Sequence, residues 1–354
     1  MSRIALLLTA SLLLGASAQA AELSVADVAG LSGPDRQKIL EDGARKEGEL
    51  LWVGSFNEDN AKPIVEGFNK RYPYIQVKRV RTDGSKALQR VLAEMRARAP
   101  RTDLITSNAI VDLKAAGAVQ PFKSPELDRF APGDTDPKGY WAPLYFIYYG
   151  LAGYNTDLVS KSEAPKTYND LLDPKWKGQI TFAASATGAM YFISILRMQW
   201  GDGKATEYLT KLGKQKIVAR TESPRTVFGM VISGEHKIMI NPFLTHIAEA
   251  ARKGAPVDLS VENPAPVSAT PVLLAKTAPH PHATMLLIDY LLGAEAQGML
   301  RDAGYFPANP AVAPLDSLKP YLPQDKNFAK YIVDEAELGN MLPESTALYQ
   351  RIFE

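Results

Sequence analysis

The sequence predicts an α/β protein of two lobes, each a mixed, mostly parallel sheet flanked by helices, with a two-strand hinge between them. Short apolar runs alternate with helix-like segments over most of the chain, which is typical of parallel sheets covered by helices. Two long extended segments, 142–153 and 266–276, flank the second of two such series. A chain of 354 residues also favours two lobes over a single hydrophobic core.

The first series begins with a helix and continues as alternating strands and helices. Ser32 can cap that helix, Pro34 suits its first turn, and Gly48 can end it. The apolar run 49–54 fits a buried strand, and 85–98 repeats apolar residues at helical spacing. The remaining expected elements are helices at 59–71 and 110–116 and strands at 75–80 and 103–105.

The second series repeats this alternation after the first extended segment. Its expected strands are 178–182, 216–218 and 237–240, and its expected helices are 187–200, 204–213, 224–233 and 245–253. Two further helices, 282–292 and 294–302, follow the second extended segment. We therefore expect residues 21–142 and 276–354 to form lobe 1 and residues 143–275 to form lobe 2. Two crossings between lobes would allow them to close around a ligand.

Residues 1–20 predict a secretory signal peptide. Arg3 supplies positive charge, residues 4–14 form an apolar core, and Ala18-Gln19-Ala20 has the small residues that signal peptidase accepts. The alternative, a membrane anchor, is disfavoured because the apolar core is too short to span a bilayer. We expect cleavage after Ala20 and a periplasmic protein without a lipid anchor.

Composition excludes several kinds of function. The chain has no cysteine, which rules out disulfides, thiol nucleophiles, cysteine-based metal sites and a cysteine-linked lipid anchor. Its net charge of +1 gives no indication of binding to nucleic acid or to an anionic membrane. Serine-nucleophile and zinc-protease motifs are absent, so an exported hydrolase is the disfavoured enzyme alternative. We expect a monomer with no catalytic residues, no metal site and no cofactor.

The candidate ligand site lies in the loops that follow the strands. Ligands of such sheets bind beyond the carboxyl ends of the strands, and these loops are rich in small polar residues. The candidate ligand-binding residues are Ser55, Asn57, Gly84, Ser85, Ser107, Asn108, Tyr148, Ser185, Thr187, Gly188, Ser223, Arg225, Asn241 and Thr245. The alternative for each is an ordinary turn, a helix cap or hinge packing, and for Arg225 a surface ion pair.

The chemistry of these loops favours an organic anion. Ala183–Gly188 joins a strand to a helix, where free backbone N–H groups and the helix dipole favour a carboxylate or phosphate. Thr82–Ser85 offers the same arrangement in lobe 1, although Asp83 would oppose an anion if it faced inward. Arg225 can hold a carboxylate or phosphate through two parallel hydrogen bonds. Apolar walls can come from Phe146, Tyr148 and Phe243.

Five segments, taken in order, resemble those of a known family. They are Gly153–Val159, Tyr168–Gly178, Ser233–Glu235, Ala255–Val257 and Asp289–Gln297. The second resembles the signature W-x-D-L-L-D-P-K-W-K-G, with Tyr168 in place of the tryptophan. The mature chain is similar to bacterial extracellular solute-binding proteins of the type II periplasmic-binding fold, in the branch that includes iron(III)-binding proteins. The resemblance implies capture of a small solute between the lobes and delivery to the membrane permease of an ABC importer.

The sequence departs from the iron-binding members of this family at one place. Those members have two consecutive tyrosines after the strand equivalent to 237–240, whereas this chain has Asn241-Pro242-Phe243. Phenolate oxygens suit a hard trivalent cation, and amide and phenyl groups do not.

No other residues replace the missing tyrosine pair convincingly. Tyr148 and Tyr149 are adjacent, and on an extended strand they would face opposite sides. The histidines at 246, 280 and 282 are too scattered for a convincing metal site. An organic anion is therefore the expected ligand, with an iron(III)-binding protein of a ferric importer as the first alternative. A binding component that feeds a sensor kinase would share the same fold and remains the second.

Overall fold

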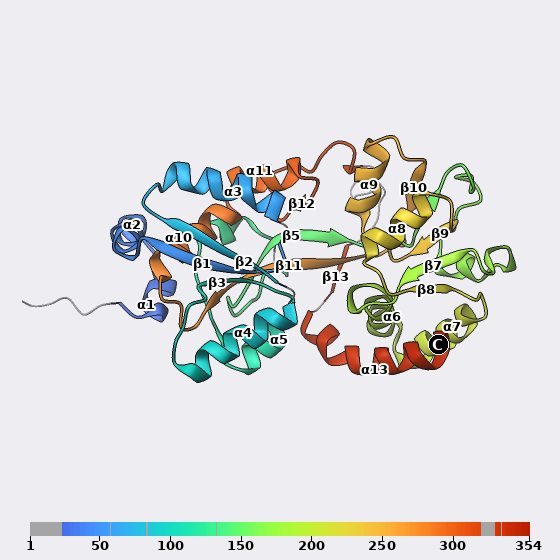
Figure 1. Cartoon of the computed structure of the whole chain (residues 1–354), viewed down its shortest axis with the longest axis horizontal. Helices are drawn as coiled ribbons and strands as arrows, with labels where there is room; N and C mark the ends of the chain where they lie inside the picture. Colours follow the sequence, from blue (N-terminus) through green and yellow to red (C-terminus); the bar gives the residue numbers. More distant parts are fainter. Residues whose placement is uncertain (1–22, 57, 83, 132, 320–329, 334) are drawn as a thin grey trace, which may run out of the picture.

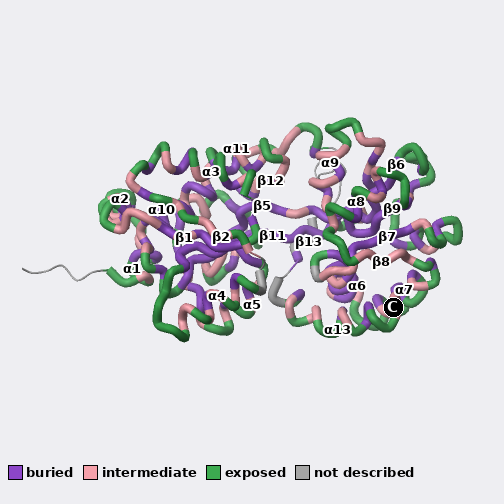
Figure 2. Tube along the Cα trace, in the orientation of Figure 1, coloured by how far each residue is buried: buried purple, intermediate pink, exposed green. Residues whose placement is uncertain are grey.

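A computed structural model describes residues 23–56, 58–82, 84–131, 133–319, 330–333 and 335–354. Two lobes lie side by side, each with a sheet at its centre (Figure 1). Figure 2 shows the buried residues along these central strands and the exposed residues on the outer helices. The two-lobed α/β fold is confirmed. The expected signal peptide lies outside the described residues, and within them no helix is long and apolar enough to cross a membrane.

The sheet of lobe 1 has the strand order β12-β5-β11-β3-β1-β2, with β4 and β13 also paired to β11. β1 (Glu49–Gly54) is parallel to β2 (Gln76–Arg81) and to β3 (Leu104–Thr106). β11 (Ala265–Ala275) is antiparallel to β3 and to β5 (Ala142–Tyr148). The short strands are β4 (Val119–Gln120), β12 (Phe306–Pro307) and β13 (Lys330–Ile332). The carboxyl ends of β1, β2 and β3 point toward lobe 2 (Figure 1).

Helices cover both faces of this sheet. They are α1 (Val25–Gly30), α2 (Arg36–Glu47), α3 (Glu58–Arg71), α4 (Gly84–Ala97), α5 (Ile110–Ala115), α10 (Pro281–Leu292), α11 (Ala294–Asp302) and the 3-10 helix η1 (Pro125–Arg129). α3, α10 and α11 pack together on one face, and α4 and α5 lie on the other (Figure 1). α10 is buried on nearly every side because α1, α2 and the sheet surround it. α3, α4 and α5 begin at the edge that faces lobe 2.

The sheet of lobe 2 has the order β10-β6-β9-β7-β8. Its strands are β6 (Ala152–Asn155), β7 (Ile180–Ala183), β8 (Val218–Arg220), β9 (Ile238–Ile240) and β10 (Val257–Ser260). One face carries α8 (Pro224–Ile232) and α9 (Leu244–Arg252), whose buried residues join the core of lobe 1 through the hinge. The other carries η2 (Tyr168–Leu172), η3 (Pro174–Trp176), η4 (Ala186–Met190), α6 (Tyr191–Trp200) and α7 (Asp202–Gly213). α6 and α7 form a separate core on this face.

The first extended segment is broken into two strands. Residues 142–153 were expected to form one extended crossing, but β5 ends at Tyr148 and β6 begins at Ala152. The break allows Gly150 N to donate to Pro242 O at 2.9 Å. A Cβ atom on Gly150 would lie 2.1 Å from a methyl carbon of Leu259, so a larger residue here would force the Leu259 side chain to shift. The crossing therefore pairs with lobe 1 through β5 and with lobe 2 through β6.

The chain crosses between the lobes a third time, which the sequence did not predict. β13 pairs in parallel with residues 265–267 of β11, and α13 (Glu335–Phe353) then packs on α6 and α7. Leu348 and Tyr349 are buried in the core of lobe 2. The prediction that residues 276–354 return to lobe 1 is therefore wrong for α13, because the apolar surface that this helix covers belongs to lobe 2.

Candidate functional site

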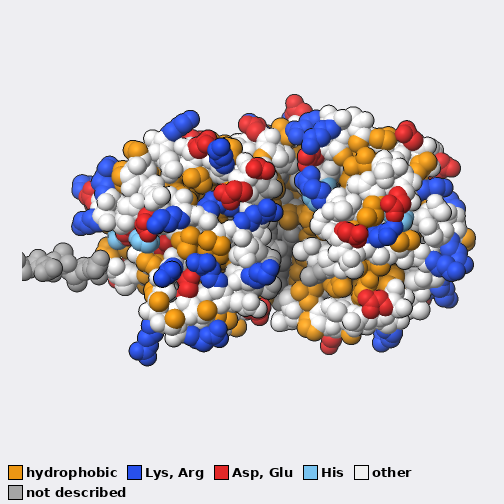
Figure 3. Space-filling view, viewed as in Figure 1, with side chains coloured by type: hydrophobic (Ala, Val, Ile, Leu, Met, Phe, Trp, Pro, Cys, Tyr) orange, Lys and Arg blue, Asp and Glu red, His pale blue; other side chains and the backbone are white. Residues whose placement is uncertain are grey.

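A cavity of about 590 Å³ lies between the two lobes, and we call it the interlobe cavity. Lobe 1 contributes the start of α3, one face of β5 and the segment after α11, and lobe 2 contributes the start of α8 and one face along the length of α9. Its polar and aromatic lining includes Asp59, Asn60, Tyr145, Arg225, Phe243, Thr245, His246, Glu249, Arg252, Lys253, Asp302 and Tyr305. Figure 3 shows a groove between the lobes with charged side chains on both banks. The volume is typical of small-molecule sites, which span roughly 300–1,000 Å³.

The lobe 2 bank of the cavity carries a charged network. Arg225 Nη1 donates to Glu249 Oε2 at 2.8 Å, and Lys253 Nζ donates to the other carboxylate oxygen at 2.7 Å. Burial raises the pKa of Glu249, but the hydrogen bonds from Lys253 and Arg225 outweigh it and lower the pKa to about 2. Arg252 lines the same bank. Three cations and one carboxylate therefore line this bank, which leaves it with an excess of positive charge.

His246 lines the same cavity from the first turn of α9. Its ring packs against the ring of Phe243, with the two centroids 5.0 Å apart. Burial lowers the pKa of His246 to about 4, and the nearby Arg225 acts in the same direction. The imidazole is therefore neutral at pH 7, with one ring nitrogen as donor and the other as acceptor. Its Nδ1 is buried and has no hydrogen-bond partner among the residues that the structure describes.

The lobe 1 bank presents two tyrosines and an amide. The rings of Tyr145 and Tyr305 lie 4.4 Å apart, and Asn60 Nδ2 donates to Tyr305 Oη at 2.8 Å. Burial raises the pKa of Tyr305, and the charges of Arg225 and Glu249 act on it from lobe 2. Side chains from the two lobes therefore lie close enough across the cavity to contact one small ligand.

The loop between β7 and α6 carries further polar groups of lobe 2. Ser185 Oγ is buried without a hydrogen-bond partner among the described residues, and Thr187 is exposed. Gly188 approaches the backbone so closely that a Cβ atom there would lie 2.2 Å from Ala183 O. Asn241 adopts φ of 54° and donates Nδ2 to Gly188 O at 3.3 Å. The loop after β9 is thereby tied to the loop after β7.

A family model described as bacterial extracellular solute-binding protein matches residues 64–330, which is more than half of the chain. The chain belongs to this family of bacterial extracellular solute-binding proteins. The recognition made from the five sequence segments is confirmed, and the family consists of binding proteins.

Individual proteins match this solute-binding protein at low sequence identity. An uncharacterised protein of Haemophilus influenzae is 26% identical over 272 residues, which cover 72% of this chain and 75% of that protein. The Trichodesmium protein IdiA (FutA), solved with iron and citrate, is 19% identical, with a TM-score of 0.74 over 86% of this chain and 99% of its own. Iron-bound HitA of Pseudomonas aeruginosa is 20% identical, with a TM-score of 0.73 and the same coverage. AfuA of Actinobacillus pleuropneumoniae, solved with fructose-6-phosphate, is 21% identical, with a TM-score of 0.70 over 87% of this chain and 99% of its own.

Of the ligand-binding residues predicted from sequence, Arg225 and Thr245 line the interlobe cavity of the solute-binding protein. Tyr148 does not line it, because its ring packs against Phe306 with centroids 4.5 Å apart. Side chains alternate along a strand, so Tyr145 and Ile147 present the opposite face of β5 to the cavity. The alternative of hinge packing is the one that the structure shows for Tyr148.

The other predicted residues of lobe 1 lie where β1, β2 and β3 end. Ser55 and Asn108 are exposed, and Gly84 and Ser85 form the first turn of α4. Ser107 is buried, and its Oγ accepts a hydrogen bond from Ala109 N at 3.1 Å. Asn57 lies outside the described residues.

Ser223, in lobe 2, caps α8 by accepting a hydrogen bond from Thr226 N at 3.2 Å. The hydroxyl groups of Ser107 and Ser223 are therefore engaged in a turn and a helix cap. These are the structural roles that the sequence left open as alternatives.

Sequence reasoning missed several residues that line the cavity. Tyr145 and Ile147 could have been found, because alternation along β5 places them together on the face opposite Tyr148. His246 was considered only as a metal ligand. Tyr305 offers no local signal, since it reaches the cavity from the segment after α11, far away in the sequence.

The region that would hold iron differs from a phenolate site. Asn241, Pro242 and Phe243 follow β9, as the sequence shows. Tyr149 stacks on Tyr191 with centroids 4.8 Å apart, whereas Tyr148 packs on Phe306. The two adjacent tyrosines thus face opposite sides, which confirms the prediction made for an extended strand. Within the described residues, no group of three or more His, Cys, Asp or Glu side chains is placed to hold a metal ion.

Proposed function

We propose that this protein captures a small organic anion in the interlobe cavity by closure of its lobes and delivers it to the membrane permease of an ABC importer. The observation that carries the proposal is the charge distribution of the cavity. The lobe 2 bank carries three cations, Arg225, Arg252 and Lys253, and a single carboxylate, Glu249, which pairs with Arg225 and Lys253. An anion placed there would gain charge-assisted hydrogen bonds without displacing a buried structural contact, because the side chain of Arg225 is 62% exposed.

The lobe 1 bank supports a polar rather than an apolar ligand. Asn60, Tyr145 and Tyr305 line it, together with Asp59 and Asp302. Acidic groups on this side disfavour a negatively charged ligand group next to them and favour hydroxyl groups. The ligands named for two solved relatives, citrate with iron and fructose-6-phosphate, both combine an anionic group with hydroxyl groups.

Export to the periplasm as a cleaved monomer without a lipid anchor is part of the proposal. It rests on the signal-like residues 1–20, the absence of cysteine and the family name. A sensor kinase in place of a permease would need the same capture step. Deletion of the gene should abolish uptake of the identified anion by cells, and loss of a kinase response with normal uptake would identify the sensor instead.

Iron(III) is the second candidate ligand, because iron-bound proteins are among the solved relatives. The segment Asn241–Phe243 opposes it, since it offers no phenolate oxygen for a hard trivalent cation. An iron(III)–citrate complex would need coordinating protein side chains from elsewhere in the interlobe cavity.

Thermal unfolding of the ligand-free mature protein tests the proposal. The panel is citrate, iron(III) with citrate, hexose phosphates, dicarboxylates, inorganic phosphate, neutral sugars and polyamines. Saturation at 100 times Kd should add about 2.7 kcal/mol to the free energy of unfolding. We expect an organic anion to give this shift. Stabilisation by neutral or cationic compounds alone would refute the proposal, and stabilisation by iron without effect from citrate would establish the iron alternative.

Arg225→Gln supplies the matched variant. Its affinity for the stabilising anion should fall roughly 10- to 100-fold, because a hydrogen bond to a charged group contributes about 1.5–3 kcal/mol. Stability without ligand should change little, since the ion pair with Glu249 is exposed on the arginine side. The control is Arg129→Gln, an exposed arginine that pairs with Glu126 in lobe 1 away from the cavity.

A further inference from the structure

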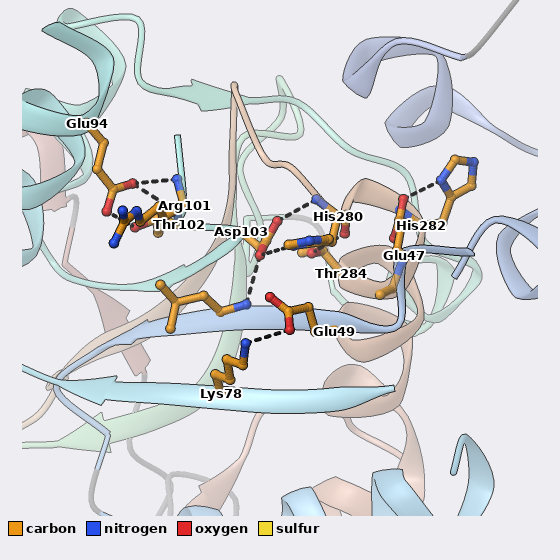
Figure 4. Close-up of polar contacts among 12 residues, drawn as sticks. Glu47, Glu49, Lys78, Glu94, Arg101, Thr102, Asp103, His280, His282 and Thr284 are labelled. Atoms are coloured by element: carbon orange, nitrogen blue, oxygen red, sulfur yellow. Dashed lines mark hydrogen bonds and ion pairs between the residues drawn. The ribbon is translucent and has the colours of Figure 1, made fainter. Parts of the chain in front are cut away.

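His246 differs from every other histidine of this chain in its hydrogen bonding. The sequence contains four histidines, and all four lie in the described part of the structure. His236 Nε2 lies 3.3 Å from an Arg220 nitrogen and 3.6 Å from a Glu235 oxygen. Figure 4 shows the other two contacts, His280 Nδ1 to Asp103 Oδ2 at 3.0 Å and His282 Nδ1 to Glu47 Oε1 at 2.6 Å.

In contrast, the Nδ1 atom of His246 is buried with no hydrogen-bond partner among the described residues, and the side chain lines the interlobe cavity. Buried polar groups of native proteins are nearly always hydrogen-bonded, so an unpaired nitrogen on a side chain that lines a ligand cavity indicates a partner that this ring gains when the lobes close on the ligand. Within the part of the chain that the structure describes, no ion pair or helix cap accounts for this imidazole nitrogen.

The surroundings of His246 determine which chemical group it can bind. The imidazole is neutral at pH 7 because of burial and the nearby Arg225. A neutral imidazole offers one donor and one acceptor, which match a hydroxyl group, whereas a carboxylate or phosphate gains more from the guanidinium of Arg225 next to it. Tyr305 and Asn60 line the same cavity from lobe 1 with further neutral polar atoms.

We propose that His246 is a specificity-determining residue that hydrogen-bonds a hydroxyl group of the captured anion. The inference rests on the proposed function and narrows it. The ligand class becomes hydroxylated organic anions, in which a hydroxyl group lies a short carbon chain away from the carboxylate or phosphate bound at Arg225. Both hydroxy acids and sugar phosphates have this chemistry.

Calorimetric titration with ligand pairs that differ by a single hydroxyl group tests the inference. The pairs are citrate and propane-1,2,3-tricarboxylate, malate and succinate, and glucose 6-phosphate and 2-deoxyglucose 6-phosphate. In at least one pair the wild-type protein should bind the hydroxylated member about tenfold more tightly, because the analogue leaves a buried polar group unpaired. Equal affinity within every pair would overturn the inference.

Two variants show whether His246 is the cause of the preference. His246→Leu should bind the analogue without the hydroxyl group as well as wild type does, and should lose the preference for the hydroxylated partner. His246→Asn retains a donor and an acceptor and should keep part of the preference. The control is His236→Gln, which lies away from the cavity and should keep all of it.

The outcomes separate this inference from the proposed function. If organic anions bind but His246→Leu keeps the full preference, the proposed function stands and the role of His246 is refuted. If no organic anion binds the wild-type protein, both are refuted. The titrations of wild type with the ligand pairs test the inference even if His246→Leu does not fold.

Discussion

At the scale of single residues, we expect His280 to couple the stability of lobe 1 to pH. Asp103 is fully buried, and its carboxylate accepts hydrogen bonds from Leu51 N at 2.8 Å and His280 N at 2.7 Å (Figure 4). Its Oδ2 also lies 3.0 Å from His280 Nδ1, and this hydrogen bond raises the pKa of His280. The carboxylates of Glu47 and Glu49 act in the same direction. All these groups lie at the edge of the sheet opposite the interlobe cavity.

Because the folded-state pKa of His280 is raised, its stabilising contribution is fully present below about pH 6.5, the usual value in an unfolded chain. The contribution is lost as pH rises through the folded-state pKa. The difference in free energy of unfolding between wild type and His280→Gln should therefore shrink from pH 6 to pH 8, as measured by urea denaturation. His236→Gln is a control without this loss of stability at higher pH, because burial lowers the pKa of His236 instead of raising it. A difference for His280→Gln that does not vary with pH would contradict the prediction.

Single residues also show which features of the site the sequence can predict and which depend on the tertiary fold. Alternation along a strand predicts that Tyr148 and Tyr149 face opposite sides, which the structure confirms. It does not tell which side holds the ligand, because that depends on Phe306, which packs on Tyr148 from a distant segment. Arg225 was predicted from its place at a helix start, a local signal. Tyr305 and Asn60 meet in the cavity only through the tertiary fold.

At the scale of elements, apolar runs and glycines in the sequence predicted the strands and helices whose ends they set. The strand at 49–54 and the helix at 294–302 have the bounds expected from apolar runs and glycines. α13 was not predicted from the sequence. It contains a proline, Pro343, within the helix. Its stability comes from residues such as Leu348 and Tyr349, whose partners lie on lobe 2. An element that depends on distant contacts carries little signal of its own.

Arg197 of α6 connects this helix to α13 through hydrogen bonds. Its side chain is 6% exposed; its Nη1 donates to Ser345 Oγ at 3.0 Å and its Nη2 to Glu344 Oε2 at 2.5 Å. Arg197→Met should lower the free energy of unfolding by about 1–3 kcal/mol, because buried hydrogen bonds to a charged group are lost. Hydrogen exchange in α13 should also speed up more than in α8. The control Lys211→Met removes an exposed ion pair of α7, and an equal effect of both variants would contradict this role of Arg197.

At the scale of the whole molecule, three segments connect the lobes instead of two, and this limits how they can move. β5 and β11 pair with each other along the hinge, and β13 adds a third strand before α13 docks on lobe 2. α13 also reaches lobe 1, where Gly339 lies against Val111 of α5. Closure around a ligand must therefore bend three neighbouring strands together and shift the contact between α13 and α5.

Small-angle scattering measures that closure directly. The radius of gyration should fall when the stabilising anion is added at saturation, because the lobes move together around the interlobe cavity. If the Kd of Arg225→Gln exceeds this anion concentration, the variant should keep the radius of gyration of the ligand-free protein. An unchanged radius of gyration, with binding proven by calorimetry, would mean that the third crossing already holds the lobes in their ligand-bound arrangement. Since a ligand shifts an equilibrium only by its differential affinity for the two states, the permease would then have to recognise the ligand-occupied cavity itself and not a closed form.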